Sequence, residues 1–360
     1  MERRSFVQAA GLTGLAGALA AGAAPAVHAQ VQTRWRMGPG TVPGFCAAAD
    51  ATVQLARRVA EMTGGGFQID MLADSTAAMP SSRAIDAAVT GHVEIVHVAT
   101  ADLIARDEAF AFGAGMPFGL DARQMDAWLL SGSGEALMRT LHAEHGLVNL
   151  PGGHTGAPLG GWFHRPLARL DDLRGLRLQA GGITGQVLER LGAVTAARPA
   201  VEARSALQDG GLDAGLFAGP HDDLQMGLHR SASHCAYPAF GDGDCRFAFL
   251  VNPRAHAALP RQHQAVLEAA ARQVHADILD RYDMLNPVAL RKLVAAGTRL
   301  FRLPQDALDA AFEESQAVCA ELCARNPAFR TLWADQRKVR ADLALWQRFA
   351  APGFDPAAIV

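Results

Sequence analysis

The chain has 360 residues, of which 50% are hydrophobic and 19% are charged, and its formal net charge is -3. This composition excludes a disordered chain, because enough residues are apolar to bury a core and few are charged. The 33 basic and 36 acidic residues give no overall electrostatic reason to expect nucleic acid or an anionic membrane as a partner. Five cysteines in this length exclude a disulfide-stapled scaffold.

The first 29 residues have the features of an export signal. Residues 2–6, Glu-Arg-Arg-Ser-Phe, precede an uncharged run, Val7 to Ala26, and Val27-His28-Ala29 suits cleavage by signal peptidase. The pair Arg3-Arg4 followed by Ser and Phe resembles a twin-arginine signal, which exports proteins that have already folded. A membrane helix is disfavoured because Ala and Gly dominate the run. We therefore expect cleavage before Gln30 and a soluble periplasmic protein.

The first half of the mature chain alternates between strands and helices. In chain order we expect a strand (34–37), a Gly/Pro loop (38–44), a helix (47–62) ending at three glycines, a strand (67–71), a helix (82–90) stopped by Gly91 and a buried strand (93–98). Repeated β-α-β units imply a mostly parallel sheet with helices on its faces.

A second series of strands and helices begins after the Gly-rich stretch 151–161. It contains a strand (176–179), a helix (184–191), a strand (214–217) and a strand (247–251) that returns toward the first unit. The tail, 304–349, is helical with a break near Pro327, and residues 307–323 carry an apolar stripe that suits packing on the chain itself or on a partner. Two lobes with several crossings predict a ligand cleft between them.

Motifs for catalysis are largely missing from the sequence. It has no nucleophile elbow, no P-loop and no G-x-G-x-x-G. His142 and His145 lie three apart on a predicted helix, but no third ligand is near, so a solvated helix face is favoured over a metal site. Cys235 and Cys245 flank a turn, where they would pair across a hairpin or be two small buried residues. We expect no catalytic residue, no metal and no cofactor.

An ordered series of motifs runs from residue 160 to residue 224. It comprises Gly160-Gly161-Trp162-Phe163, Leu170-Asp171-Asp172-Leu173-Arg174-Gly175, Gly182 to Gly185, Ala206-Leu207-Gln208-Asp209-Gly210 and Gly219-Pro220-His221-Asp222-Asp223. Together these resemble the periplasmic solute-binding subunits of TRAP transporters, the DctP-type family, nearest the branch that binds 2-oxo acids. The resemblance implies a receptor that closes over a small molecule by hinge motion and delivers it to TRAP permease membrane subunits.

The resemblance and the pattern predict an α/β, two-lobed periplasmic binding protein with a ligand cleft between the lobes and a long C-terminal helical segment. The expected division is a signal peptide (1–29), lobe 1 (30–153 plus about 248–303), lobe 2 (154–247) and the C-terminal helical segment (304–360). The resemblance also implies that the C-terminal helix forms a homodimer in some relatives.

The sequence departs from the family where the ligand is bound. The family has an arginine that forks onto the ligand carboxylate, and here that position is Gln179. An Arg–carboxylate fork is a charge-assisted contact worth about 1.5–3 kcal/mol per hydrogen bond, so a simple carboxylate should bind much more weakly unless another cation takes over. Of the two arginines nearby in sequence, Arg177 and Arg246, the second is the better candidate.

Further departures concern the metal set and the walls of the cleft. Pro158 replaces a family Gln, Leu216-Phe217 replaces a Glu-Trp pair that helps to hold a cation, and Asp242 keeps one oxygen ligand. One carboxylate alone is a poor cation cage, so we expect no sodium or calcium. Asp102 would bring negative charge to the cleft, or be a solvated loop residue. Wall residues, unless they are ordinary core, are Trp162, Phe217, Phe240 and His154.

These departures change the ligand chemistry but leave the scaffold motifs intact. They suggest a receptor retuned to another ligand, such as a neutral or an amine-bearing one. Two other classes remain open. One is an exported enzyme or redox protein, which the missing cofactor motifs disfavour. The other is a ligand-sensing or adaptor protein with no transport role, which only the absence of a ligand would distinguish.

Overall fold

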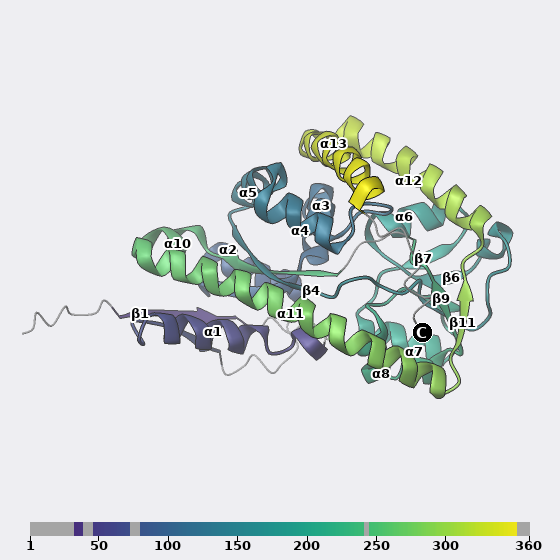
Figure 1. Ribbon diagram of the computed structural model, residues 1–360, viewed down its shortest axis with the longest axis horizontal. Coiled ribbons are helices and arrows are strands. Elements are labelled where there is room, and N and C mark those ends of the chain that lie inside the picture. The colour runs from purple at the N-terminus through teal and green to yellow at the C-terminus, as the bar shows by residue number, and fades with distance from the viewer. Residues whose placement is uncertain (1–31, 39–45, 73–79, 241–244, 351–360) are drawn as a thin grey trace, which may run out of the picture.

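The computed structural model describes residues 32–38, 46–72, 80–240 and 245–350, which form two lobes, each built on its own β-sheet (Figure 1). The predicted signal peptide and Asp242 lie outside the described residues. Within the described ranges, no helix is both long enough and apolar enough to cross a membrane.

Lobe 1 has a five-stranded sheet with helices on both faces. Its strand β10 alternates between two apolar clusters: Phe247 and Phe249 enter one, Ala248 and Leu250 the other. β1 is parallel to β2 and β3, whereas β10 is antiparallel to β3 and β4. The strand order is β2 (Phe67–Met71), β1 (Thr33–Met37), β3 (Ile95–Ala99), β10 (Arg246–Val251) and β4 (Val148–His154). The helices are α1 (Ala51–Met62), α2 (Ser81–Thr90), α3 (Ala111–Ala114), α4 (Ala122–Ser131), α5 (Ser133–Glu144) and α10 (Pro253–Ala258).

Lobe 2 has a six-stranded sheet of short strands, in which β5 is antiparallel to both of its neighbours. The strand order is β11 (Arg299–Arg302), β9 (His234–Tyr237), β5 (Trp162–Phe163), β8 (Ala214–Gly215), β6 (Arg177–Gln179) and β7 (Val194–Ala196). The helices are α6 (Gly182–Arg190), α7 (Ala200–Gln208), α8 (Pro220–Met226) and α9 (Leu228–Ser231).

A single helix of 35 residues, α11 (Arg261–Ala295), runs from one lobe to the other (Figure 1). In lobe 1 it packs on α1 and β4, where Leu267, Val274 and Ile278 are buried. In lobe 2 it packs on α8, and there the hydroxyl of Tyr282 donates a hydrogen bond to Asp222 Oδ2 at 2.7 Å. Because α11 contacts both lobes over its length, it is one of the elements that set their relative position.

The C-terminal helices return the chain from lobe 2 to lobe 1. α12 (Gln305–Arg325) packs on α6, and α13 (Pro327–Ala350) packs on α4 and α5 (Figure 1). The expected break at Pro327 is confirmed. The apolar stripe of α12 packs on the chain itself: Ala311, Val318 and Leu322 are buried, although Phe312 stays 42% exposed.

Two parts of the prediction are wrong. The sheets are mixed and not mostly parallel, because strands that cross between the lobes, such as β4 and β10, run against a neighbour. The segment Arg299–Arg302, assigned to lobe 1, is β11 at the edge of the lobe 2 sheet, where it pairs in parallel with β9. The chain reaches that edge because α11 ends beside lobe 2, so the next strand adds there.

Candidate functional site

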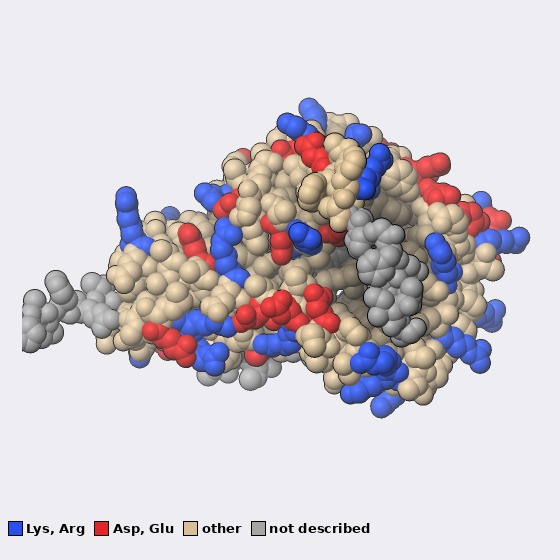
Figure 2. All heavy atoms as spheres, viewed as in Figure 1, with Lys and Arg blue, Asp and Glu red and all other residues tan. Residues whose placement is uncertain are grey.

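The N-terminus of α6 lies at the end of lobe 2 that faces lobe 1. A Cβ placed on Gly182 would lie 3.6 Å from Ile104 Cδ1 of lobe 1, and one placed on Gly181 would lie 3.1 Å from Ala197 Cβ, just after β7. Gly182 has a φ of 59°, a conformation that favours glycine. The surface is hollowed where the two lobes meet (Figure 2). The N–H groups of the first turn of α6 therefore lie at the interlobe boundary, where they favour an anion.

The side chain of Gln179, at the end of β6, is bound to its own lobe. Its Nε2 donates to the carbonyl oxygen of Arg198 at 3.1 Å, and its Oε1 accepts from the N–H of Arg198 at 3.1 Å. Both ends of the amide are thus used on the loop between β7 and α7. In this arrangement Gln179 holds that loop against the end of β6.

Among the described residues, the positions that the resemblance matches to the family's cation ligands are apolar. The ring of Phe217 lies over Gly215, where an added Cβ would be 2.6 Å from Cε2, and Leu216 lies over Gly161 in the same way at 2.8 Å. Pro158, in the segment between β4 and β5, is half-buried and adds no oxygen from its side chain. These residues do not fit a calcium or sodium ion, which prefers several oxygen ligands.

Asp102 lies on the lobe 1 side, in the 3-10 turn Thr100–Leu103 that precedes Ile104. Its side chain is exposed, yet protein atoms surround it closely enough that desolvation raises the pKa of the carboxyl, against a hydrogen bond from Ser81. A carboxyl in a recess has both properties. Asp102 stays a candidate for the cleft, because it lies in the turn directly before Ile104, which approaches Gly182 of lobe 2.

Trp162 and Phe240 belong to the packed core. Trp162 is fully buried in the apolar cluster of lobe 2, and its Nε1 donates to Asp223 Oδ2 at 2.8 Å. Phe240 is 2% exposed and lies in the cluster that extends through lobe 1. Their placement supports the alternative that the sequence left open, ordinary core packing.

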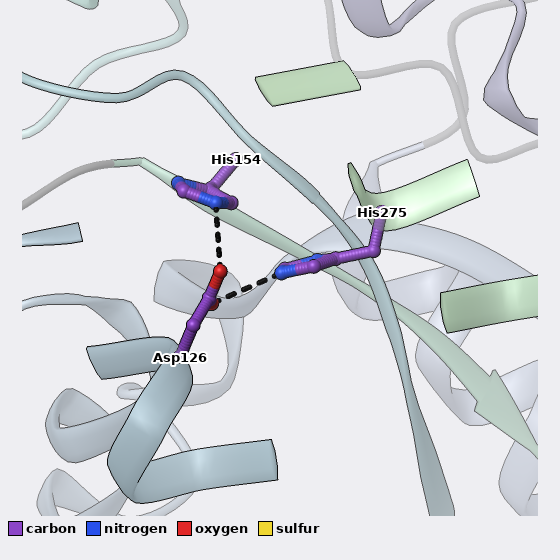
Figure 3. A group of neighbouring side chains, drawn as sticks. All are labelled: Asp126, His154 and His275. Atoms are coloured by element: carbon purple, nitrogen blue, oxygen red, sulfur yellow. Dashed lines mark hydrogen bonds and ion pairs between the residues drawn. The ribbon is translucent and has the colours of Figure 1, made fainter. Parts of the chain in front are cut away.

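His154 and Arg246 meet in a largely buried ionic cluster around Asp126. Figure 3 shows the carboxylate of Asp126 with the rings of His154 and His275 beside it. Asp126 Oδ1 accepts from Arg246 Nη2 at 2.6 Å and from His275 Nε2 at 3.0 Å, and Oδ2 lies 3.3 Å from His154 Nε2. His154 ends β4 and pairs in register with Arg246, which begins β10. Asp126 comes from α4 and His275 from the middle of α11. The cluster therefore joins four elements, three of which lead from lobe 1 to lobe 2.

The hydrogen bonds fix the tautomer of His275 in this cluster. The N–H of Gly153 donates to Nδ1 of His275 at 3.0 Å, so a neutral His275 carries its proton on Nε2 and donates it to Asp126. Burial lowers the pKa of His275, which keeps the ring neutral. Burial alone would raise the pKa of Asp126, but the hydrogen bonds from His154 and His275 and the charge of Arg246 hold it well below its ordinary value.

The same cluster has the spacing of a metal site but not its chemistry. Donor atoms of Asp126, His154 and His275 all lie within 4.8 Å of one another. However, Nε2 of His275 holds a proton and the guanidinium of Arg246 already lies on the carboxylate. The arrangement favours an ion pair with supporting histidines over a bound metal. Arg246 also donates to the carbonyl of Ala122 at 3.1 Å, so it serves this cluster and not the end of lobe 2 as expected.

A cavity of about 460 Å³ lies inside lobe 1, between α5 and α11 above β4, away from the α6 terminus. Most of its charged residues are already paired: Glu135 accepts from Arg139 at 2.9 Å and from Arg272 at 3.5 Å, and Arg246 is bound to Asp126. The cavity therefore offers little unpaired charge to a ligand.

His142 is buried in the wall of this cavity, so the solvated helix face predicted for it is wrong. Its Nδ1 donates to the carbonyl of Met138 at 2.7 Å, and its ring lies edge-on to Phe110. Burial lowers the pKa of His142 to about 4. The described cysteines, Cys235, Cys245, Cys319 and Cys323, are free thiols.

The comparisons with known proteins decide the family. Residues 47–326 match the family described as bacterial extracellular solute-binding protein, family 7, also called DctP. The chain belongs to this family. It is 34% identical to a monocarboxylate 2-oxoacid-binding periplasmic protein of Nostoc sp. (strain PCC 7120) over 90% of this chain and 87% of the relative. Its fold class and its place among TRAP periplasmic solute-binding proteins are thus as the sequence predicts.

Solved structures of TRAP solute-binding proteins share the two-lobed fold. One from Bordetella bronchiseptica RB50, with calcium and picolinate in one site of a dimer, has 34% identity and a TM-score of 0.82, covering 89% of this chain and 95% of that one. Another, from Colwellia psychrerythraea with calcium and pyruvate, has 26% identity and a TM-score of 0.83, covering 89% and 97%. Proteins of this family bind small molecules and work with a membrane permease.

Proposed function

We propose that this TRAP solute-binding protein captures a small organic carboxylate between its lobes and hands it to a permease. The observation that carries the proposal is the N-terminus of α6, whose Gly182 faces Ile104 of lobe 1. The N–H groups of the first helical turn and the helix dipole favour an anionic oxygen at that point. The 2-oxoacid-binding relative and the picolinate and pyruvate complexes support the same ligand class.

The proposed mode of binding needs no metal ion. The two solved relatives hold calcium together with their ligands. Here the positions that the resemblance matches to the family's cation ligands are the apolar residues Leu216 and Phe217. The ligand must then be held by protein groups alone. A receptor retuned to a neutral or amine-bearing ligand is the competing hypothesis, since Gln179 replaces the family arginine.

Thermal melting of the mature protein against 2-oxo acids, hydroxy acids, dicarboxylates, amino acids and polyamines, each with and without calcium, tests this function. A ligand at about 100 times its dissociation constant adds about 2.7 kcal/mol, which raises the melting midpoint by a few degrees. We expect such a shift with small carboxylates, equal in calcium and in EDTA. A calcium-dependent shift would contradict the metal-free mode. A shift only with neutral or cationic compounds would exclude a carboxylate as the ligand and favour the competing hypothesis.

Two finer proposals complete this function. Export by the twin-arginine route rests on the pair Arg3-Arg4 and on the small residues before Gln30. N-terminal sequencing of the periplasmic protein should begin at Gln30, and inhibition of Sec alone should not block export. A homodimer through the C-terminal helix rests on Leu345, Trp346 and Phe349 of α13, which are 57%, 64% and 80% exposed.

A further inference from the structure

Three arginines are close, in sequence or in space, to the position that Gln179 occupies. Arg177 is committed to Asp213, to which its Nε and Nη2 donate at 2.9 and 2.6 Å. Arg246 is committed to Asp126. Arg198 is exposed, and its backbone is the group that Gln179 binds. No ion pair joins the Arg198 guanidinium to any residue that the structure describes.

The backbone of Arg198 is placed at the interlobe end of lobe 2. The residue before it, Ala197, lies against Gly181, directly before α6. The next glycine, Gly182, lies against Ile104 of the opposite lobe. Gln179 is the last residue of β6 and Arg198 follows β7, and the carboxyl ends of these parallel strands meet at this edge. The backbone of Arg198 is therefore held next to the segment that contacts the N-terminus of α6, and that N-terminus in turn contacts lobe 1.

From this arrangement we propose that Arg198 is the carboxylate-binding residue of this receptor, with Gln179 as the residue that positions it. The inference rests on the proposed function, that the ligand carries a carboxylate. A guanidinium offers paired donors that match a carboxylate, and the α6 N–H groups beside it add to the positive potential. Gln179 pins the Arg198 backbone from both its N–H and its carbonyl, which fixes where the side chain starts.

The positioning role explains why a glutamine is suited to residue 179. Its amide presents one acceptor and one donor, which match the N–H and the carbonyl of a single residue, Arg198. A carboxylate there would match only the N–H, and an arginine only the carbonyl. The guanidinium then comes from the loop after β7 and not from the end of β6, where the family has its arginine. The ligand carboxylate is therefore expected to lie closer to β7 than it does with the family arginine.

Isothermal titration with pyruvate and picolinate, and with the uncharged pyruvamide and picolinamide, tests the inference on the mature full chain. Arg198→Ala should weaken the two acids roughly ten- to a hundredfold, the range of lost charge-assisted hydrogen bonds, and leave the two amides unchanged. Arg198→Lys should recover part of the loss, because a point charge remains without the fork. Gln179→Ala should give a smaller loss for the acids, again without an effect on the amides.

The matched control is Arg302→Ala, an exposed arginine at the opposite edge of the same sheet, which should change neither acids nor amides. Thermal midpoints of all variants verify that they fold. If the wild type binds the acids and Arg198→Ala binds them equally well, the inference is overturned while the proposed function stands. If the wild type binds none of the carboxylates tested, the proposed function itself fails, and the inference with it.

Discussion

Asp223 shows how folding changes the chemistry of a single residue. Burial raises the pKa of this carboxyl to about 7, and the hydrogen bond from Trp162 only partly offsets that rise. The neighbouring Asp222 is also buried, and its negative charge acts in the same direction. The folded protein therefore keeps a proton on Asp223 that the unfolded chain, with an ordinary pKa of about 3.9, releases.

The contribution of Asp223 to the stability of the protein should fall as the pH rises from about 4 to about 7. In that window the folded state binds more protons than the unfolded state, and the difference ends above the folded pKa. Asp223→Asn keeps an acceptor for Trp162 and removes the titration. The free energy of unfolding of the variant, relative to that of the wild type, should therefore increase by a few kcal/mol from pH 5 to pH 8. Urea unfolding at both pH values measures this. The exposed Asp209→Asn is the control, and parallel wild-type and Asp223→Asn curves would contradict the prediction.

Single residues were also where the sequence was least informative. The departure at Gln179 could be recognised because a family motif surrounds it. The partner that gives Gln179 its role, Arg198, lies 19 residues later in a loop with no motif. Asp126 and His275 were missed for a similar reason: they lie 149 residues apart on two helices, and no local pattern marks them. Only His154 and Arg246 were singled out, for another role.

At the scale of elements, the Asp126 cluster acts where the chain leaves lobe 1. One carboxylate binds the last residue of β4, the first residue of β10 and the middle of α11. Of these, Arg246 and His275 are each 4% exposed in their side chains, while Asp126 is 26% exposed. A buried arginine that loses its carboxylate is costly, since no water replaces the lost partner.

Asp126→Asn should therefore destabilise the protein by roughly 3 kcal/mol, the low end for breaking a buried pair, because Asp126 keeps some contact with water. Guanidinium unfolding measures the loss. Asp171→Asn, which breaks an exposed pair with Arg174, should cost less than about 1 kcal/mol. Equal losses in the two variants would show that the cluster does not tie these elements together.

The response to zinc tests whether the Asp126 cluster is an ion pair or a metal site. Since Nε2 of His275 carries a proton, neither zinc nor EDTA should change the melting midpoint of the wild type. A zinc-dependent rise that disappears in His275→Gln would reverse the assignment.

The arrangement of the whole molecule was partly predictable. Hydrophobic periodicity identified most strands, and the expected return strand 247–251 lies in the first sheet between β3 and β4. Its apolar run fits a strand that is buried on both faces. The placement of β11 was not predictable from its residues. Three of its four side chains are exposed, so no apolar pattern shows which sheet it joins, and the direction of α11 decides it.

The outer end of α13 bears on how whole molecules associate. The buried part of this helix ends near Gln336, and beyond it Leu345, Trp346 and Phe349 are exposed among the residues described. A group of large exposed apolar side chains at one helix end is typical of a surface that a partner covers. A second copy of the chain carries the same surface, so the two copies of α13 can cover each other across a twofold axis. Light scattering on the mature protein should therefore give the mass of a dimer, and the double variant Trp346→Glu, Phe349→Glu the mass of a monomer. Met284→Glu, at a residue 75% exposed on α11, is the matched control and should remain dimeric. A monomeric wild type, or a dimeric double variant, would exclude α13 as the interface.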